Sequence, residues 1–258
     1  LGIPILGSVY RQTDLETPSR HLGLVQAQEL EQLETFLDTT ANMVSKAVDI
    51  NQLLSLMSDI NQPSSIPKLL PPPAQSIAIA KDAAFSFSYP HLLREWHNMG
   101  AEISFFSPLE NQAPKSADLI FLPGGYPELH AGKLANADIF KKAMKSAPSV
   151  YGECGGYMAM GEGLVDANGL RHEMLGLLSL ETSFANRKLS LGYRKLTPNR
   201  LWSIPLTGHE FHYATTLRAD GDPLFQATDA EDLQLPNMGL IKGSASGSFA
   251  HIIDRQSN

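Results

Sequence analysis

The apolar positions beyond residue 76 alternate between short runs and helical spacing. Short apolar runs, typical of buried strands, occur at 77–80, 101–106, 117–122 and 149–151. Between these runs, apolar residues recur at helical spacing over 89–99 and 140–146. Strands that alternate with helices in this way predict an α/β fold, with a mostly parallel sheet flanked by helices.

The pattern becomes β-rich beyond Gly176. Strands are expected at 177–184, 188–196, 208–213 and 247–253, with a turn at Pro198-Asn199-Arg200. The stretch 247–253 is predicted to be a single strand that carries His251 near its end.

The first sixty residues predict a separate part of the chain. The run Ile3–Tyr10 predicts a buried strand, and helical spacing over 29–57 predicts two helices, with breaks near Thr39-Thr40 and near 48–51. The Pro- and Ser-rich stretch after these helices predicts a semi-rigid linker. We therefore divide the chain into an N-terminal part over 1–61, a linker over 62–75 and a domain over 76–258.

Composition narrows the class of protein. The chain has 258 residues, of which 43% are hydrophobic, so it can bury a sizeable core. The formal net charge of −7 argues against a nucleic-acid or anionic-membrane surface. No apolar run is long enough to span a bilayer and no signal-peptide pattern is present, so we expect a cytoplasmic protein. Because the chain begins at Leu1, we expect a fragment or a processed chain.

The candidate chemistry centres on the single cysteine, Cys154, which excludes an internal disulfide and a cysteine-based metal cage. It lies in a Gly-x-Cys-Gly-Gly setting between a predicted strand and a predicted helix, which is typical of a nucleophile elbow. The small flanking residues Gly152 and Gly156 let the backbone double back. A helix N-terminus at the thiol is expected to lower its pKa. The alternative is a buried, inert cysteine.

A cysteine nucleophile needs donors for an oxyanion and a base. The N–H of Gly155 is a natural first donor, and the turn at Gly124-Gly125 could supply the second, unless it is an ordinary strand exit. Both glycine turns follow predicted strands, so they can face one pocket. The candidate bases are His21, His91, His97, His130, His172, His209, His212 and His251.

Position along the predicted elements separates these histidines. His91 and His97 lie on a predicted surface helix, where we expect them to be solvated. His209 and His212 are three positions apart on a predicted strand and would point to opposite faces, which argues against a metal site. Outside the domain, Arg20 and His21 could bind an anionic substrate, or be a solvated arginine beside a packed histidine.

Several motifs together resemble one known family. The Cys154 setting with Pro123–Glu128 is similar to the class I, triad-type glutamine amidotransferases, in the subfamily of the cobyrinate a,c-diamide synthases. Further stretches resemble that subfamily at Arg20–Val25, Asp82–Phe87, Gly192–Arg194, Gly208–Tyr213 and Ser248–His251. The resemblance covers nearly the whole chain and implies a flavodoxin-like sheet.

The resemblance implies roles for particular residues. Cys154 matches the nucleophile that attacks glutamine and releases ammonia, and His251, late in the domain, matches its base better than His212 does. Gly125 and Gly155 match the oxyanion donors. The family's usual glutamate two positions after the histidine is replaced here by Ile253, so a Cys-His dyad is expected and the group that orients His251 stays open. Expected substrate-binding residues are Arg20, His21, Tyr126 and His212.

The resemblance also implies a partner activity. In the subfamily, an ATP- and Mg²⁺-dependent synthetase domain of the P-loop type activates the a and c acetate carboxylates of cobyrinate or hydrogenobyrinate, on the route to cobalamin, and ammonia amidates them. This chain has no Gly-x-x-x-x-Gly-Lys-[Ser/Thr] motif, and 1–61 resembles only the tail of that domain. The chain alone is therefore expected to be at most a glutaminase without cofactors or metal.

Other interpretations of the same residues stay open. The acceptor could be another tetrapyrrole or a cell-wall precursor, and the corrinoid and ATP would bind through the missing synthetase domain. The chain could also be a non-catalytic binding module or an unrelated cysteine hydrolase. A homodimer is compatible with every one of these readings.

Overall fold

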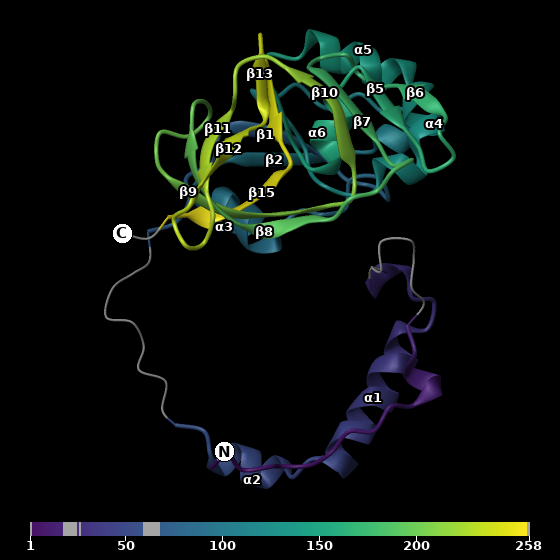
Figure 1. Cartoon of the computed structure of the whole chain (residues 1–258), viewed down its shortest axis with the longest axis vertical. Helices are drawn as coiled ribbons and strands as arrows, with labels where there is room; N and C mark the ends of the chain where they lie inside the picture. The colour runs from purple at the N-terminus through teal and green to yellow at the C-terminus, as the bar shows by residue number, and fades with distance from the viewer. Residues whose placement is uncertain (1, 18–24, 26, 59–67, 257–258) are drawn as a thin grey trace. The chain divides into compact units, whose positions relative to one another are not determined.

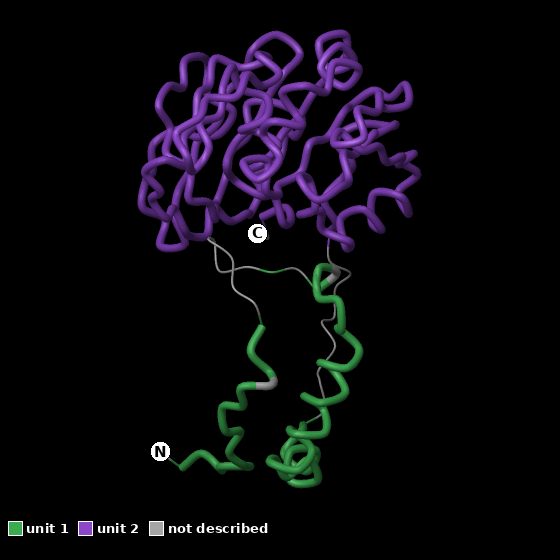
Figure 2. The backbone as a smooth tube through the Cα atoms, turned by 90° about the vertical axis from the view of Figure 1, so that its right-hand side faces the viewer, with its two compact units in different colours: residues 1–66 green, residues 67–258 purple. Residues whose placement is uncertain are grey.

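The computed structural model describes residues 2–17, 25, 27–58 and 68–256 of the chain. It divides the chain into two compact units, residues 1–66 and residues 67–258 (Figures 1 and 2). The boundary falls inside the Pro- and Ser-rich stretch. No helix among the described residues is both long enough and apolar enough to cross a bilayer.

Unit 1 is helical over most of its described length. Its helices are η1 Thr13–Leu15, η2 Ala27–Glu29, α1 Leu33–Ala47 and α2 Ile50–Ser55. The expected break at Thr39-Thr40 is wrong, because α1 runs through both residues. Each threonine hydroxyl donates to the carbonyl oxygen four residues earlier at 2.7 Å, which satisfies it within the helix. The break near 48–51 is confirmed: Asp49 caps α2 by accepting the N–H of Gln52 at 2.9 Å.

The apolar run Ile3–Tyr10 is not a buried strand. Ile3, Ile5 and Tyr10 are 73%, 87% and 80% exposed, and the run is joined to the rest of unit 1 by one isolated bridge, from Gly7 to Val48. A buried strand needs a neighbour that pairs along its length and a layer that covers its side chains. The described part of unit 1 provides neither.

Unit 2 is built on a six-stranded sheet in the order β13-β14-β4-β3-β1-β2 (Figure 1). All neighbouring pairs are parallel except the edge pair of β13 with β14, which confirms the predicted mostly parallel sheet. The strands are β1 Ser76–Ala80, β2 Glu102–Phe106, β3 Leu119–Leu122, β4 Val150–Glu153, β13 Leu240–Lys242 and β14 Ala245–Ser248.

Both faces of this sheet are covered, because its central strands are apolar on both sides. Along β1, Ile77 and Ile79 pack into one hydrophobic cluster and Ala78 and Ala80 into the other. The alanine face is covered by α4 Ala131–Ala135, α5 Asp138–Ser146 and α6 Gly155–Met160. The isoleucine face is covered by α3 Pro90–Asn98 and by strands of a second sheet.

The β-rich region beyond Gly176 is present and forms parts of two further sheets. One has the order β10-β7-β5-β6 and the other the order β12-β11-β8-β9-β15. Their strands are β5 Gly163–Val165, β6 Arg171–Glu173, β7 Ser179–Ser183, β8 Ser190–Pro198, β9 Leu206–His212, β10 Thr215–Asp220, β11 Phe225–Thr228, β12 Gln234–Met238 and β15 Ala250–Arg255. Two 3-10 turns, η3 Pro108–Glu110 and η4 Pro127–Leu129, complete unit 2 as described.

The stretch 247–253 belongs to two strands, not to the single strand that the sequence predicts. Its first part lies in β14, parallel to β4, and its second part lies in β15, antiparallel to β9. Phe249 separates them, and Oγ of Ser248 accepts the N–H of Ala250 at 3.0 Å, which turns the chain out of the first ladder. Ser248 pairs with Glu153, which is the last residue of β4. His251 comes three residues after Ser248, so it lies just beyond the carboxyl end of β4.

Candidate active site

The turn from β4 to α6 has the conformation of a nucleophile elbow. Cys154 adopts φ 47° and ψ −104°, a region that residues other than glycine rarely occupy. The glycines on both sides are required by close packing. A Cβ at Gly152 would lie 2.8 Å from the backbone of Gly156, and a Cβ at Gly156 would overlap the carbonyl of Leu122. The sequence thus places its one cysteine on a tight turn at the end of a central strand.

The thiol of Cys154 is buried and neutral in this state. Its Sγ donates to the carbonyl oxygen of Phe211 at 3.7 Å, and the residue is 3% exposed. Burial raises the pKa of the thiol well above its usual range, and the carboxyl of Glu128 raises it further, whereas the N–H of Gly155 acts in the opposite direction. The helix N-terminus thus acts in the expected direction, through the N–H of Gly155, but the net lowering of the thiol pKa that the sequence predicts is wrong, because burial outweighs it. The six-residue α6 does not offset the burial of the sulfur.

The Gly124-Gly125 turn lies between the elbow and His251. A Cβ on Gly155 would come within 2.9 Å of the backbone nitrogen of Gly125. On the other side, a Cβ on Gly124 would overlap Cε1 of His251 and lie 3.2 Å from Nε2. The turn itself is packed on backbone, because a Cβ on Gly125 would overlap the carbonyl of Ala84. The glycine turn is therefore a neighbour of both the elbow at Cys154 and His251, as the sequence predicts.

His251 is held as a buried, neutral imidazole. Its ring stacks on that of His209, and the edge of Tyr89 lies 6.2 Å away between centroids. Burial, together with the smaller effects of His209 and His212, lowers the pKa of His251 to about 3. A neutral ring has a nitrogen lone pair that can take a proton, which is what a base for the thiol requires.

The comparison with protein families now decides the identity of this domain. A family model described as the CobB/CobQ-like glutamine amidotransferase domain matches residues 76–258. The chain belongs to this family. The family that the sequence motifs predict is thereby confirmed.

Relatives of this amidotransferase domain carry more specific names. Hydrogenobyrinate a,c-diamide synthases of Brucella abortus and Rhizobium meliloti are 50% and 47% identical to the chain over 98% of its length. The chain spans 61% of the length of each of these relatives. Because the alignment covers 98% of the chain, unit 1 takes part in the similarity as well.

A solved structure described as a glutamine amidotransferase aligns with 68% of this chain and 89% of its own length. It is 13% identical, with a TM-score of 0.44.

His212 occupies a different position from His251 in the amidotransferase domain. Its ring stacks on Phe249 at 3.8 Å between centroids, Nδ1 faces the carbonyl oxygen of Ala214 at 3.1 Å, and Nε2 faces Oε1 of Glu210 at 2.8 Å. Both ring nitrogens are thus occupied by oxygen acceptors, so neither is free to take the thiol proton. Glu210 is held in turn by Arg194, whose guanidinium and His212 lower the pKa of this carboxyl.

The other sequence-predicted residues are placed as follows. Tyr126 is buried, with its ring edge-on to Phe87 at 5.1 Å between centroids. Arg20 and His21 lie outside the described residues. His97 is exposed, as expected, but the prediction for His91 is wrong: it is half-buried, and its Nε2 lies 3.0 Å from the carbonyl oxygen of Ile253.

Glu153 is the functional candidate that the sequence reasoning missed. It directly precedes Cys154 at the end of β4, and the residue is 2% exposed. Oε1 accepts the hydroxyl of Tyr151 at 2.9 Å and the N–H of Ile252 at 3.2 Å, while Oε2 lies 3.9 Å from Nδ1 of His251. Burial raises the pKa of Glu153 to about 8. The available signal was an acidic residue ending an otherwise uncharged buried strand.

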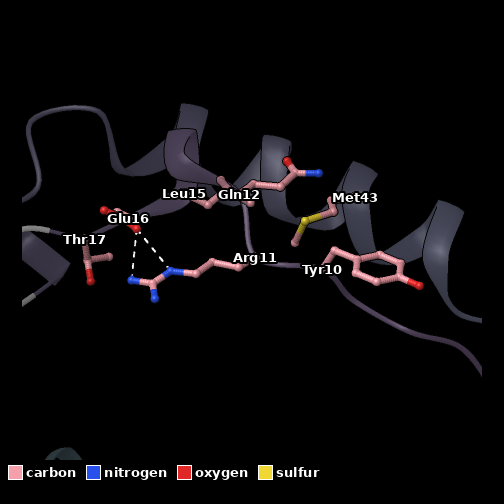
Figure 3. Close-up of a pocket in the computed structure, with 7 residues that line it drawn as sticks. All are labelled: Tyr10, Arg11, Gln12, Leu15, Glu16, Thr17 and Met43. Atoms are coloured by element: carbon pink, nitrogen blue, oxygen red, sulfur yellow. Dashed lines mark hydrogen bonds and ion pairs between the residues drawn. The ribbon is translucent and has the colours of Figure 1, made fainter.

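Unit 1 presents a surface hollow near its N-terminal segment (Figure 3). It is lined by Tyr10, Arg11, Gln12, Leu15, Glu16, Thr17 and Met43. The side chains of Arg11 and Glu16 form an ion pair there and are 87% and 53% exposed, so water screens the interaction. Within the described ranges, no cluster of three or more metal-ligating side chains occurs in either unit.

Proposed function

We propose that this domain hydrolyses glutamine with Cys154 as nucleophile and His251 as base. The observation that carries the proposal is the packing at the elbow. Cys154 is held at positive φ at the end of β4, and the N–H-bearing nitrogen of Gly125 lies beside Gly155. A buried nucleophile next to two closely packed backbone N–H groups suits acyl transfer through a tetrahedral intermediate.

The proposed reaction proceeds through a thioester. Sγ of Cys154 gives its proton to Nε2 of His251 and forms a bond to the side-chain amide carbon of glutamine. The N–H groups of Gly125 and Gly155 stabilise the negative charge on the amide oxygen. The intermediate then loses the C–N bond, and His251 returns the proton to the leaving nitrogen, so ammonia departs. Water hydrolyses the thioester, which releases glutamate and restores the thiol.

The consumer of the ammonia is proposed from the names of the relatives. We propose that the longer protein amidates the a and c acetate carboxylates of hydrogenobyrinate or cobyrinate, with ATP and Mg²⁺ bound outside the described chain. The support is the 50% and 47% identity to hydrogenobyrinate a,c-diamide synthases, which includes unit 1. Arg20, His21, Tyr126 and His212 stay predicted substrate-binding residues.

Location and assembly are further proposals about the longer protein. A cysteine that acts as nucleophile must stay reduced, which suits the cytoplasm. Assembly as a homodimer stays a prediction, which light scattering of the longer protein would check.

A glutamine analogue with a diazoketone warhead tests the glutaminase directly. We expect one covalent adduct on Cys154, detected by mass spectrometry, no adduct in Cys154→Ser, and strongly slowed labelling in His251→Ala. His97→Ala, an exposed histidine, should label like the unaltered chain. Absence of the adduct in the unaltered chain would favour a non-catalytic module. For the acceptor, the longer protein should convert hydrogenobyrinate to its diamide with ATP and glutamine; glutaminase activity without this product would point to another acceptor.

A further inference from the structure

We infer that Glu153 is the positioning residue for His251, taking the role that other enzymes give to the third member of a triad. The inference rests on the proposed role of His251 as base. It assigns the orientation of that ring to the residue directly before the nucleophile, on β4, and not to a residue on the strand that carries the histidine.

The geometry gives the first argument. Glu153 and His251 are each 2% exposed, so both side chains are removed from water. Among the described atoms, Nδ1 of His251 has no hydrogen-bond partner, although it is buried. Oε2 of Glu153 is the acceptor that the structure brings to this nitrogen, at 3.9 Å. A buried ring nitrogen without a partner is costly, so a contact that closes by about 1 Å would satisfy it.

The anchoring of Glu153 gives the second argument. Its Oε1 is fixed by the hydroxyl of Tyr151 and by the N–H of Ile252. The Tyr151 ring is itself packed, stacked on Phe121 at 5.4 Å between centroids. The Ile252 bond comes from the residue next to His251, so the same carboxylate holds both the backbone of β15 and the position of the ring. The other carboxylate oxygen of Glu153, Oε2, is the one that lies towards Nδ1 of His251.

The protonation state of Glu153 selects the tautomer of His251. An ionised carboxylate accepts a hydrogen bond from Nδ1–H, which keeps the ring proton on Nδ1 and leaves Nε2 as the free acceptor for the thiol proton. After proton transfer, the same carboxylate stabilises the buried imidazolium. A protonated Glu153 would instead donate to Nδ1, which puts the ring proton on Nε2 and removes the base.

Other titratable groups face the pair from the surrounding elements. His209 and His212 lie on β9, and Tyr151 lies on β4. Tyr89 directly precedes α3, and Cys154 directly precedes α6. None of these supplies a carboxylate to Nδ1. The nearby Glu210 is already held by Arg194 and His212.

Glu153→Gln is the decisive variant, because it keeps the shape of the side chain and Oε1 as acceptor. Its amide group would donate to Nδ1, and so it imitates the protonated acid at every pH. At about pH 8.5 we expect kcat for glutamine hydrolysis to fall by about 100-fold or more, with KM changed by less than about threefold. Towards about pH 6 the rates of the variant and the unaltered chain should converge, since the protonated Glu153 of the unaltered chain then donates to Nδ1 as the glutamine amide does. A merely structural role would produce no such convergence.

Tyr151→Phe is the matched second variant. It removes the donor on the Oε1 side and leaves the side that faces His251. That hydroxyl lowers the pKa of Glu153 against the effect of burial. The rise of the rate with pH should therefore shift to higher pH, while the maximal rate is retained. If Glu153→Gln does not fold, the shift of the pH–rate profile in Tyr151→Phe still tests the role of Glu153. A pH–rate profile that does not shift would overturn the inference.

A measurement without glutamine separates this inference from the proposed function. Nitrogen-15 NMR of histidine-labelled chain should show the Nδ1–H tautomer of His251 above about pH 8 and the Nε2–H tautomer in Glu153→Gln. The same tautomer in both proteins, or a Glu153→Gln rate within about threefold at about pH 8.5, would overturn the role of Glu153. If the unaltered chain neither hydrolyses glutamine nor labels at Cys154, the proposed function fails, and the tautomer still reports on Glu153.

Discussion

The imidazole of His251 lies flat against that of His209, with ring centroids 4.9 Å apart and ring planes 9° from parallel. The two residues also pair directly across the ladder between β15 and β9. His209 is fixed by a 2.6 Å contact between its Nε2 and the hydroxyl of Tyr89. Because Gly124 packs against His251 as well, the candidate base is held by neighbours on more than one side.

This stacking predicts the effect of His209→Phe on the base. A positive charge on His209 opposes a positive charge on His251, which lowers the pKa of His251 in addition to burial. Phenylalanine keeps a ring in the stack and removes that charge, so the pKa of His251 should rise. An NMR titration of the His251 ring measures the change, with His97→Phe on the exposed side of α3 as control. No rise would mean that the charge of His209 does not contribute to the pKa of His251.

The tight turn at Gly125 predicts a cost for any side chain there. In Gly125→Ala the new Cβ would overlap the carbonyl of Ala84, so the turn must move away from the elbow. We expect kcat for glutamine hydrolysis to fall by about 100-fold or more, the usual cost of losing an oxyanion donor. The matched control is Gly132→Ala in α4, where the nearest atom is 3.9 Å from the new Cβ. That variant should keep full activity and gain up to about 1 kcal/mol of stability.

The buried thiol predicts slow chemistry with simple alkylating reagents. Since burial raises the pKa of Cys154, little thiolate is present at neutral pH. The rate of modification by iodoacetamide should be far below that of a free cysteine peptide at about pH 7 and should climb with pH without reaching a plateau by about pH 9. Because Cys154 is the sole cysteine, total adduct by mass spectrometry reports on it alone. Fast labelling at neutral pH would show a thiolate instead.

The raised pKa of Glu153 predicts how stability varies with pH. Burial shifts it from 4.5 to about 8, so the folded state holds this proton more tightly than the unfolded state. The contribution of Glu153 to the free energy of unfolding is therefore largest below about pH 4.5 and is lost as the pH rises through about 8. Glu153→Gln cannot ionise, so in urea titrations its free energy of unfolding should fall less over this window. Glu128, whose pKa burial raises to about 7, would give part of the remaining slope.

The sequence predicted the parts of this fold that depend on local pattern. Apolar runs such as Ile77–Ala80 are buried on both faces wherever they are central, and the glycine at 152 is required by contacts with the backbone of Gly156 and Tyr157 in the same turn. These constraints act over a few residues, so they can be recognised without the structure. The same holds for the break near 48–51 between α1 and α2.

The parts that could not be predicted depend on contacts between distant segments. The apolar side chains of Ile3–Tyr10 are buried only if another segment packs over them. The sequence of this stretch does not show that such a segment is absent from the described part of unit 1. The pKa of Cys154 depends on how deeply the elbow is buried, which the helix that follows it does not reveal. Glu153 was missed because the search for a carboxylate followed the family's spacing after His251, whereas the carboxylate comes from a strand almost a hundred positions earlier.

The break at Phe249 has a mechanical consequence. It sends the chain from the sheet whose strand β4 leads to Cys154 into the sheet that carries His251, so the proposed nucleophile and the proposed base belong to separate layers. Their separation is set by the alignment of one layer on the other and not by the internal geometry of either. A slip of less than an ångström between the layers would change the rate while leaving every ladder hydrogen bond intact.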